Sequence, residues 1–232
     1  VDTVLLTHAH EDHLAGVSAV RFGAIGVHRL DHDALSSIDG LMRLYGVPES
    51  EWPAMSELVT GRFHYLGWPD AEALDDGAVI DLGDVTVRLV HAPGHTAGHS
   101  VYLVESDGGR VLVTGDIDLT SFGPYYGDAM SSLDDFERTL RTVRDIDADH
   151  YVTFHHKGVV TGHEPFATAI DDYWAVIDRR HQHMLQLLAS RRTIAELVAE
   201  GIVYRPGTRP PVFGDSVEEH TIGRHLDRAI AN

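Results

Sequence analysis

The order of apolar and polar residues predicts a short buried strand close to the start of the chain. Residues 4–6 form an uninterrupted apolar run, and the polar residues that begin at Thr7 mark its end. A short helix is expected over residues 12–20, followed by a second strand at Ala24–His28. The histidines that come after the first strand should therefore lie in a loop at its carboxyl end.

The middle of the chain changes from helical periodicity to strand-like alternation. Helical segments are expected over residues 31–45, with an interruption at Gly40, and over residues 49–59. Beyond them, short alternating apolar segments separated by turns predict strands, and one segment with apolar residues three to four apart predicts a helix capped by Ser132 or Asp134. The strands are expected at residues 85–89, 100–104, 110–114 and 151–154, and the helix at residues 133–146.

The C-terminal part of the chain returns to a helical pattern. Helices are expected over residues 164–190, 193–200 and 217–231, with a Pro-rich loop over residues 205–211. We therefore predict two parts, a main domain over residues 1–163 and a helical C-terminal extension over residues 164–232. The first apolar run lies so close to Val1 that we expect early strands of the main domain to precede it.

Composition and charge narrow the choice of partners. The formal net charge is -18, and no run rich in Lys or Arg occurs, so a surface that binds nucleic acid is not expected. Cysteine is absent, which excludes disulfides and thiolate metal ligands and is compatible with the cytoplasm. No apolar stretch approaches the roughly 18 residues of a membrane span, and no signal-peptide pattern opens the chain. We expect a cytoplasmic protein that acts on a small molecule away from membranes, either as a monomer or as a homodimer.

The densest chemical signal is the segment at residues 8–13, which reads His-Ala-His-Glu-Asp-His. In an extended loop His8 and His10 point to the same side, as two ligands of one metal ion do. Asp12 and His13 can face a second ion where the chain turns into a helix. A solvated polar loop would explain a single histidine, but four potential ligands within this segment favour metal binding.

A second segment, at residues 91–99, contains three histidines in a loop that its Pro and Gly residues make tight. A rigid loop presents an imidazole with little conformational entropy left to lose on metal binding. His95 would complete a three-histidine site for the first ion. His91 and His99 would instead stabilise the loop or support a ligand from behind.

Two further segments offer ligands at strand ends. Asp116 follows a predicted strand, where a carboxylate oxygen can bridge two metal ions. His155 and His156 follow the last predicted strand and supply the remaining imidazole for the second ion. Successive strand residues point to opposite faces, so only one of this pair can face the ions if the strand continues through Phe154.

These residues, in this order, resemble the signature of the metallo-β-lactamase superfamily: His-x-His-x-Asp-His, a His in a Pro-Gly-His-Thr loop, an Asp and a final His. The resemblance covers residues 3–160. It implies an α/β fold, a four-layer αββα sandwich with a dinuclear site at one edge of the two sheets, and a small winged-helix-like C-terminal extension. It also implies two divalent metal ions, expected to be zinc, with iron and manganese as alternatives. Carried over by position, the ligands are His8, His10 and His95 for the first ion and Asp12, His13 and His155 for the second, with Asp116 as the bridge.

The resemblance is closer to the glyoxalase II, lactonase and phosphodiesterase branches than to true β-lactamases, because Asp116 is present and cysteine is absent. It implies a hydrolase in which a metal-bound hydroxide attacks an ester, lactone, thioester or similar bond, while Asp12 helps to handle the proton. The alternatives are a noncatalytic metal-binding protein and a metal-dependent phosphodiesterase or nuclease. An oxygen-using diiron enzyme is disfavoured, because His10 stands where that branch carries Glu. The chain also departs from the Gly-His-Gly sequence of many relatives at Phe154-His155-His156.

Aromatic residues near these ligands are weaker signals. Phe122, Tyr125 or Tyr126 would line a pocket beyond Asp116, where a tyrosine hydroxyl could bind an oxyanion, or would pack beneath the loop. Residues 31–68 carry Met, Tyr and Trp side chains that would form either a lid over an apolar acyl group or part of the core. Both pairs of alternatives stay open at the level of the sequence.

Overall fold

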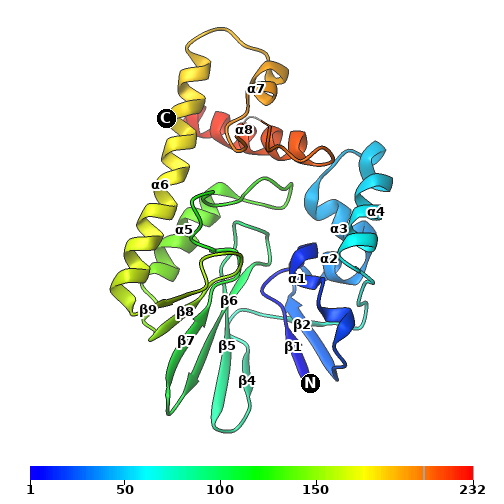
Figure 1. The fold of residues 1–232 in the computed structure, drawn as a ribbon, viewed down its shortest axis with the longest axis vertical. Helices are drawn as coiled ribbons and strands as arrows, with labels where there is room; N and C mark the ends of the chain where they lie inside the picture. The colour runs from blue at the N-terminus through cyan, green and yellow to red at the C-terminus, as the bar shows by residue number, and fades with distance from the viewer. Residues whose placement is uncertain (206, 232) are drawn as a thin grey trace.

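The computed structural model describes residues 1–205 and 207–231, and Figure 1 shows how their helices and strands are arranged. The strands are β1 (Thr3–Leu5), β2 (Ala24–His28), β3 (Glu72–Leu74), β4 (Val79–Asp81), β5 (Val85–His91), β6 (Ser100–Ser106), β7 (Gly109–Val113), β8 (His150–Val152) and β9 (Val159–Thr161). The α-helices are α1 (Glu11–Leu14), α2 (His32–Ser36), α3 (Ile38–Tyr45), α4 (Trp52–Arg62), α5 (Leu133–Arg144), α6 (His163–Leu188), α7 (Ile194–Glu200) and α8 (Gly214–Ala231). The short 3-10 helices are η1 (Val17–Ala19) and η2 (Glu49–Glu51).

The described strands form two sheets. β1, β2 and β3 make a parallel sheet, in which Val4 is paired with Ile25. β4 to β9 follow in chain order in the second sheet, which is antiparallel except for the parallel pair β7 and β8. In Figure 1, α2 to α4 lie on the side of the first sheet, at the right of the view, and α5 and α6 lie on the side of the second sheet, at the left. The predicted four-layer αββα sandwich is confirmed.

Each half of the sandwich has its own apolar core, and the two halves meet at the loop after β1. The first core includes Val27, Leu35, Leu41 and Val59, and the second includes Leu112, Phe136, Leu140, Tyr151 and Phe166. Ser100 N donates a hydrogen bond to Thr7 O (2.8 Å), and the Tyr102 hydroxyl donates to Leu6 O (2.9 Å). These bonds hold the loop that carries the first histidines against the second sheet.

The predicted helix interruption at Gly40 was wrong, and the close packing of two helices explains why. The helical stretch is interrupted at Ser37, which is extended and caps α3 by accepting a hydrogen bond from Gly40 N (3.1 Å). Gly40 itself lies within α3, where an added Cβ atom would be 2.0 Å from the carbonyl oxygen of Asp33. This glycine therefore permits the close approach of α2 and α3 and does not end a helix.

Other differences from the prediction concern short elements. The helix expected over residues 12–20 is divided, because α1 ends at Leu14 and η1 follows after a break. β3, β4 and β9, three residues each, were not predicted as strands of their own. β8 ends at Val152, so the alternation of strand side chains does not govern His155 and His156.

The C-terminal helices connect both halves of the sandwich. The first half of α6 contributes Phe166 and Ile170 to the second core, whereas its end forms a third, small core with α7 and α8. Phe213, just before α8, packs against the first core, and Figure 1 shows α8 crossing above both halves. The division after residue 163 stays a prediction, and the Pro-rich loop includes residue 206, which lies outside the described residues. In the described part of the chain, no helix combines the length and apolar character needed to span a bilayer.

A buried histidine joins α8 to the rest of the molecule. His225 is fully buried, with Nε2 3.0 Å from the Tyr126 hydroxyl and Nδ1 3.2 Å from Nδ1 of His181. Burial, together with the neighbouring His181, lowers the pKa of His225 to about 3. Because an unfolded histidine titrates near 6.5, the stability that depends on neutral His225 is fully present above that pH and is lost as the pH falls towards 3.

We expect the free energy of unfolding to fall less steeply with acidification in a His225→Gln variant than in the wild type. The variant has no group at this position that must be neutral in the folded state, so this contribution to acid destabilisation disappears. Urea unfolding measured in steps from about pH 7 to about pH 4 gives the two slopes. His183→Gln, at an exposed position on α6, is the control and should keep the wild-type slope. Equal slopes for wild type and His225→Gln would contradict the assignment.

Candidate metal centre

Three imidazoles from two loops converge above the carboxyl end of β1. The chain leaves β1 at Leu5 and is extended at His10, and the side chains of His8 and His10 reach the same space, as predicted. His8 Nε2 lies 3.2 Å from His10 Nδ1, and His95 Nε2 lies 3.1 Å from the first and 2.9 Å from the second. Nitrogen ligands about 2.0–2.1 Å from a common ion are separated by about 3 Å, which matches this arrangement.

The surroundings of each imidazole fix which ring nitrogen faces the other two rings. Burial lowers the pKa of His8 and of His95 well below the ordinary value, so both rings are neutral. His95 Nδ1 donates a hydrogen bond to Tyr125 O (2.9 Å), which leaves the lone pair on Nε2. Burial also lowers the pKa of His10, but the Asp128 carboxylate, 2.8 Å from Nε2, outweighs it and raises the pKa to about 10. His10 without a bound metal ion is therefore an imidazolium at neutral pH, in which Nε2–H donates to Asp128, and a metal ion between the three rings would displace the proton on Nδ1.

Asp116 lies between these histidines and a second group that consists of Asp12, His13 and His155. Its Oδ2 is 3.3 Å from His95 Nε2 and 3.4 Å from His155 Nε2, and its Oδ1 is 2.8 Å from His13 Nε2. Burial by itself raises the pKa of Asp116, but the surrounding imidazoles hold it well below its usual range. An ionised carboxylate thus faces both groups at once, the position a bridging ligand requires.

The chemistry of the second group fits a metal ion. His13 Nε2 and Asp116 Oδ1 are buried and close together, yet they lack hydrogen-bond geometry, and neither has another such partner among the described residues. Buried polar atoms without a partner destabilise a protein unless a further group binds them, which a cation at this point does. Five imidazoles and two carboxylates suit a divalent transition metal ion. The structure brings together all seven predicted ligands, in the groups His8, His10, His95, Asp116 and Asp12, His13, His155.

His155 and His156 separate because the chain turns beyond β8. His155 has a left-handed backbone, with φ 55°, and its Nε2 lies 3.9 Å from Asp12 Oδ2 as well as close to Asp116. His156 is exposed and lines the cavity above the ligands. The structure therefore brings His155 to the ligand group, as the sequence favoured, although a turn and not strand alternation is the cause.

The loop at residues 91–99 is stabilised by its own histidines, as predicted. His99 Nδ1 donates a hydrogen bond to Ala92 O (2.9 Å), and its Nε2 accepts one from Asp116 N (3.1 Å). His91 Nε2 donates to Ala97 O (2.8 Å). Burial lowers the pKa of His99 to about 4, so its ring is neutral and can accept from the Asp116 amide. His99 thus fixes the backbone of the bridging residue.

The sequence analysis missed Asp31, a buried carboxylate beyond β2 that joins the two histidine loops. It accepts hydrogen bonds from Ala9 N (3.2 Å), Thr96 Oγ1 (2.7 Å) and Gly98 N (2.7 Å). One side chain therefore sets the distance between His8 and His10 on one loop and His95 on the other. Its position after a predicted strand, where the other functional residues lie, was the signal that could have identified it.

Asp128 is the second functional residue that was missed. Its Oδ2 accepts the hydrogen bond from His10 Nε2, and its Oδ1 accepts one from the Tyr125 hydroxyl (2.9 Å). A carboxylate that holds the outer nitrogen of a ligating histidine fixes the ring orientation and makes the inner nitrogen more basic. No local signal marks Asp128, because it is 118 residues away from His10 in the sequence.

Helix α8 holds the segment that carries Asp128. His220 Nδ1 donates a hydrogen bond to Gly127 O (2.9 Å). The Arg224 guanidinium donates to Asp128 O and to Ser131 O, the latter at 2.8 Å. The C-terminal extension therefore reaches the metal centre through the Asp128 backbone, although no residue of α8 belongs to either ligand group.

An Asp128→Asn variant should bind metal about 10- to 100-fold more weakly than the wild type. The amide has nearly the size of the carboxylate but lacks the charge that makes His10 basic. Competition with a fluorescent chelator measures the affinity directly, without any assay of activity. Asp134→Asn, at an exposed carboxyl on α5, should leave the affinity unchanged. Wild-type affinity in Asp128→Asn would show that this carboxylate does not support the ligand.

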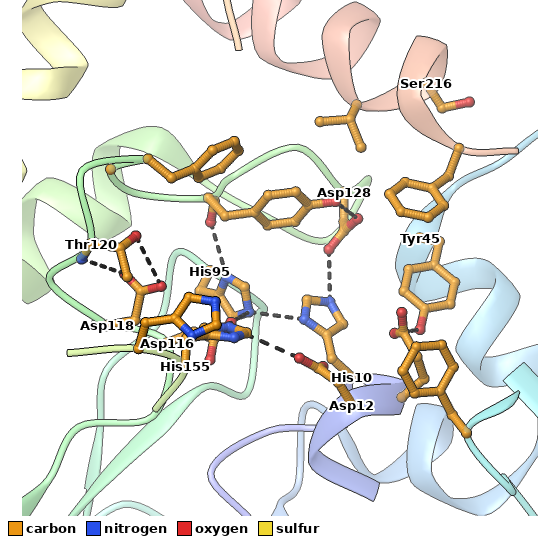
Figure 2. A pocket seen from close by; sticks show the side chains of 18 of the residues that line it. His10, Asp12, Tyr45, His95, Asp116, Asp118, Thr120, Asp128, His155 and Ser216 are labelled. Carbon is orange, nitrogen blue, oxygen red and sulfur yellow. Dashed lines mark hydrogen bonds and ion pairs between the residues drawn. The ribbon is translucent and has the colours of Figure 1, made fainter. Parts of the chain in front are cut away.

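A cavity of about 580 Å³ lies above the ligands, and Figure 2 shows its labelled side chains. Phe122 and Tyr125 line it, as the first alternative predicted, whereas Tyr126 is buried and bonded to His225. The Tyr125 hydroxyl donates to Asp128, which argues against the oxyanion role considered for it. Of the aromatic and Met residues considered for a lid, Tyr45 and Met55 line the cavity and Met42 is buried in the first core.

Comparisons with known proteins agree with this architecture. A solved metallo-beta-lactamase family protein from Thermus thermophilus superimposes with a TM-score of 0.72 at 24% identity, covering 100% of this chain and 76% of that chain. A likeness at this identity shows the fold alone.

Similar sequences include a hydroxyacylglutathione hydrolase of Acidiphilium cryptum, 35% identical over 106 residues, which are 44% of this chain and 30% of that protein. The beta-lactamase-like protein 2 homolog of Caenorhabditis elegans is 22% identical over 209 residues, 88% of this chain and 57% of that protein. The chain spans about half the length of the first curated relatives that it matches. It covers 49% of one of them and 57% of another. The family model of the metallo-beta-lactamase superfamily matches residues 1–156, and the chain belongs to this superfamily.

Proposed function

We propose that this protein is a metal-dependent hydrolase that cleaves an ester, lactone or thioester bond of a small molecule with the help of two divalent ions. The observation that carries the proposal is the pair of ligand groups joined by Asp116 at the floor of the cavity. The name of the hydroxyacylglutathione hydrolase among the relatives supports hydrolysis as the reaction class. Zinc is the first candidate for the metal, with iron and manganese as alternatives.

The roles of the residues follow from their positions. When bound, the metal ions lower the pKa of a water molecule and polarise the oxygen of the bond to be cleaved. Asp116 sets the spacing of the two groups through its two oxygens. Asp12 lines the cavity with a partly exposed carboxylate, which can accept a proton from the attacking water and pass it to the leaving group. Asp128 keeps the proton of His10 on Nε2, so that Nδ1 stays available as a ligand.

The test is metal content measured together with turnover. Gently purified protein should contain close to two equivalents of transition metal, and chelation should abolish hydrolysis in a panel of esters, lactones, thioesters and phosphodiesters until metal is restored. His155→Ala should lose about one equivalent and most turnover, whereas His156→Ala, which alters the neighbouring residue on the cavity wall, should retain both equivalents. Two bound equivalents without hydrolysis of any member of the panel would refute the proposal.

A further inference from the structure

The two ends of the cavity differ in polarity. In Figure 2, Asp118 and Thr120 lie on one side of the ligands, whereas Tyr45 and Ser216 lie on the other. The Asp118 carboxylate accepts hydrogen bonds from the amide and the hydroxyl of Thr120, so this end is polar. The wall contributed by the first core and by the start of α8 is apolar apart from Ser216 and the hydroxyl of Tyr45. Its residues are Tyr45, Val47, Met55, Phe63, Phe213, Ser216 and Val217.

The polar groups at the apolar end are already engaged or uncharged. The Tyr45 hydroxyl donates to Glu11, and its ring lies parallel to His10 at a centroid distance of 5.7 Å. The Ser216 hydroxyl is neutral, and its residue is half-buried on the first turn of α8. A ligand group at this end therefore contacts apolar surface, and neither Tyr45 nor Ser216 offers it a positive charge.

Apart from its histidines, which belong to or adjoin the ligand groups, the cavity wall has charged residues of one sign only, and these are acidic. They are Glu11, Asp12, Asp116, Asp118 and Asp128. Among the wall residues that the structure describes, none is Lys or Arg. An anionic group placed away from the metal ligands would thus be desolvated next to carboxylates, with no cation to pair with it, which is strongly unfavourable.

Several cations lie next to wall residues without lining the cavity, among them Arg224, which donates to Asp128 O. Arg180 is buried behind Phe122, where it donates hydrogen bonds to the carbonyl oxygens of Phe122 and Pro124. Arg62 is exposed and lies over the ring of Phe63, 5.4 Å from its centroid. Lys157 is exposed beyond His156 and is not part of the wall.

We infer that the substrate carries an uncharged, apolar acyl group, which occupies the end of the cavity between Tyr45 and Ser216. The leaving group then lies towards Asp118 and Thr120. This inference rests on the proposed hydrolase function and specifies its substrate class. In the reaction the acyl carbon gains the oxygen of water and loses the leaving oxygen or sulfur, which takes up one proton of that water. The products are an apolar carboxylic acid and an alcohol or thiol, and acyl groups that end in a carboxylate are rejected.

A matched pair of esters tests the inference on the metal-loaded full chain. 4-Nitrophenyl hexanoate has an uncharged acyl chain, and 4-nitrophenyl hydrogen adipate has a carboxylate at the end of a chain of the same carbon count. We expect kcat/KM for the adipate ester to be lower by at least about a hundred-fold, because no residue at the apolar end pairs with the charge. Equal or faster cleavage of the adipate ester would overturn the inference and leave the proposed hydrolase function intact.

A substitution on α8 tests the location of the acyl group. Ser216→Arg places a cation at the apolar end and should narrow the preference for the uncharged ester by at least about ten-fold. Ser216→Gln extends the side chain without charge and should leave the preference as in the wild type. A Ser216→Arg variant that keeps two metal equivalents and the wild-type preference would place the acyl group elsewhere and overturn the inference.

Failure of the proposed function itself gives a different result. If neither ester is cleaved, binding still tests the cavity, through displacement of the neutral dye Nile red by N-hexylacetamide and by 6-acetamidohexanoate. We expect the uncharged amide to displace the dye at least about ten-fold more effectively than the carboxylate. Equal or better displacement by the carboxylate would overturn the inference independently of turnover.

Discussion

An Asp116→Ala variant should lose at least about a hundred-fold in kcat/KM while its free energy of unfolding changes by no more than about 2 kcal/mol. The substitution removes the only side chain of the two ligand groups that approaches both His13 and His95 with carboxylate oxygens. Without it, the spacing between the groups is no longer fixed. The substitution removes the attraction between the Asp116 carboxylate and the imidazoles, but it also removes the desolvation cost of burying that carboxylate. The two changes partly cancel, so the effect on stability is smaller than the effect on activity.

Asp118→Ala is the matched control for the metal content in this experiment and should retain both equivalents. Asp118 lies two residues further along the same loop and also lines the cavity, but it bonds to Thr120 and belongs to neither ligand group. Turnover is measured with the two 4-nitrophenyl esters, and metal content is measured by elemental analysis. An Asp116→Ala protein that retains both ions and full turnover would show that Asp116 does not bridge the groups.

A Gly94→Ala variant should be destabilised by about 3 kcal/mol or more and should lose metal affinity with it. Gly94 has φ 129°, and an added Cβ atom would lie 2.3 Å from the Cα atom of Phe136. These are backbone neighbours in the second core, so relief requires a shift of α5 or of the loop that presents His95. Chemical denaturation gives the loss of stability, and chelator competition gives the loss of affinity.

A control variant separates the steric clash with Phe136 from the conformational cost of placing an alanine at a positive φ. Gly83 also has a positive φ, 88°, but its added Cβ atom would have open space around it. Gly83→Ala should therefore cost only about 1 kcal/mol and should leave metal affinity unchanged. Equal losses in the two variants would show that the contact with Phe136 is not the cause.

Much of the centre could be predicted because its ligands are close together in sequence or follow strands. Residues 8–13 contain four of the seven ligands, and the tight loop around His95 is encoded by local Pro and Gly residues. The strands at Ala24–His28 and Ser100–Ser106 were found because their apolar residues form continuous or alternating runs. These features depend on local sequence, which a single chain reveals.

The residues that support the ligands could not be predicted in the same way. Asp31 and Asp128 make their contacts through partners far away in the sequence. Asp128 follows Gly127 and so resembles part of an ordinary turn, whereas Asp31 had only its position after a strand as a signal. Gly40 was taken for a helix break because its close contact with Asp33 depends on how α2 and α3 pack. Tertiary contacts decide such cases, and local propensity carries no information about them.

Helix α8 limits how this enzyme candidate can be re-engineered. Its first turn supplies part of the cavity wall through Ser216 and Val217, and its later turns hold the backbone of Asp128 through Arg224. A chimera that exchanges the whole helix to obtain a new selectivity would therefore also disturb the orientation of His10. Libraries confined to Phe213 and Ser216 change the wall while the hydrogen bonds from Arg224 to the Asp128 segment stay in place, whereas Val217 should be kept because it packs against Gly127, next to Asp128.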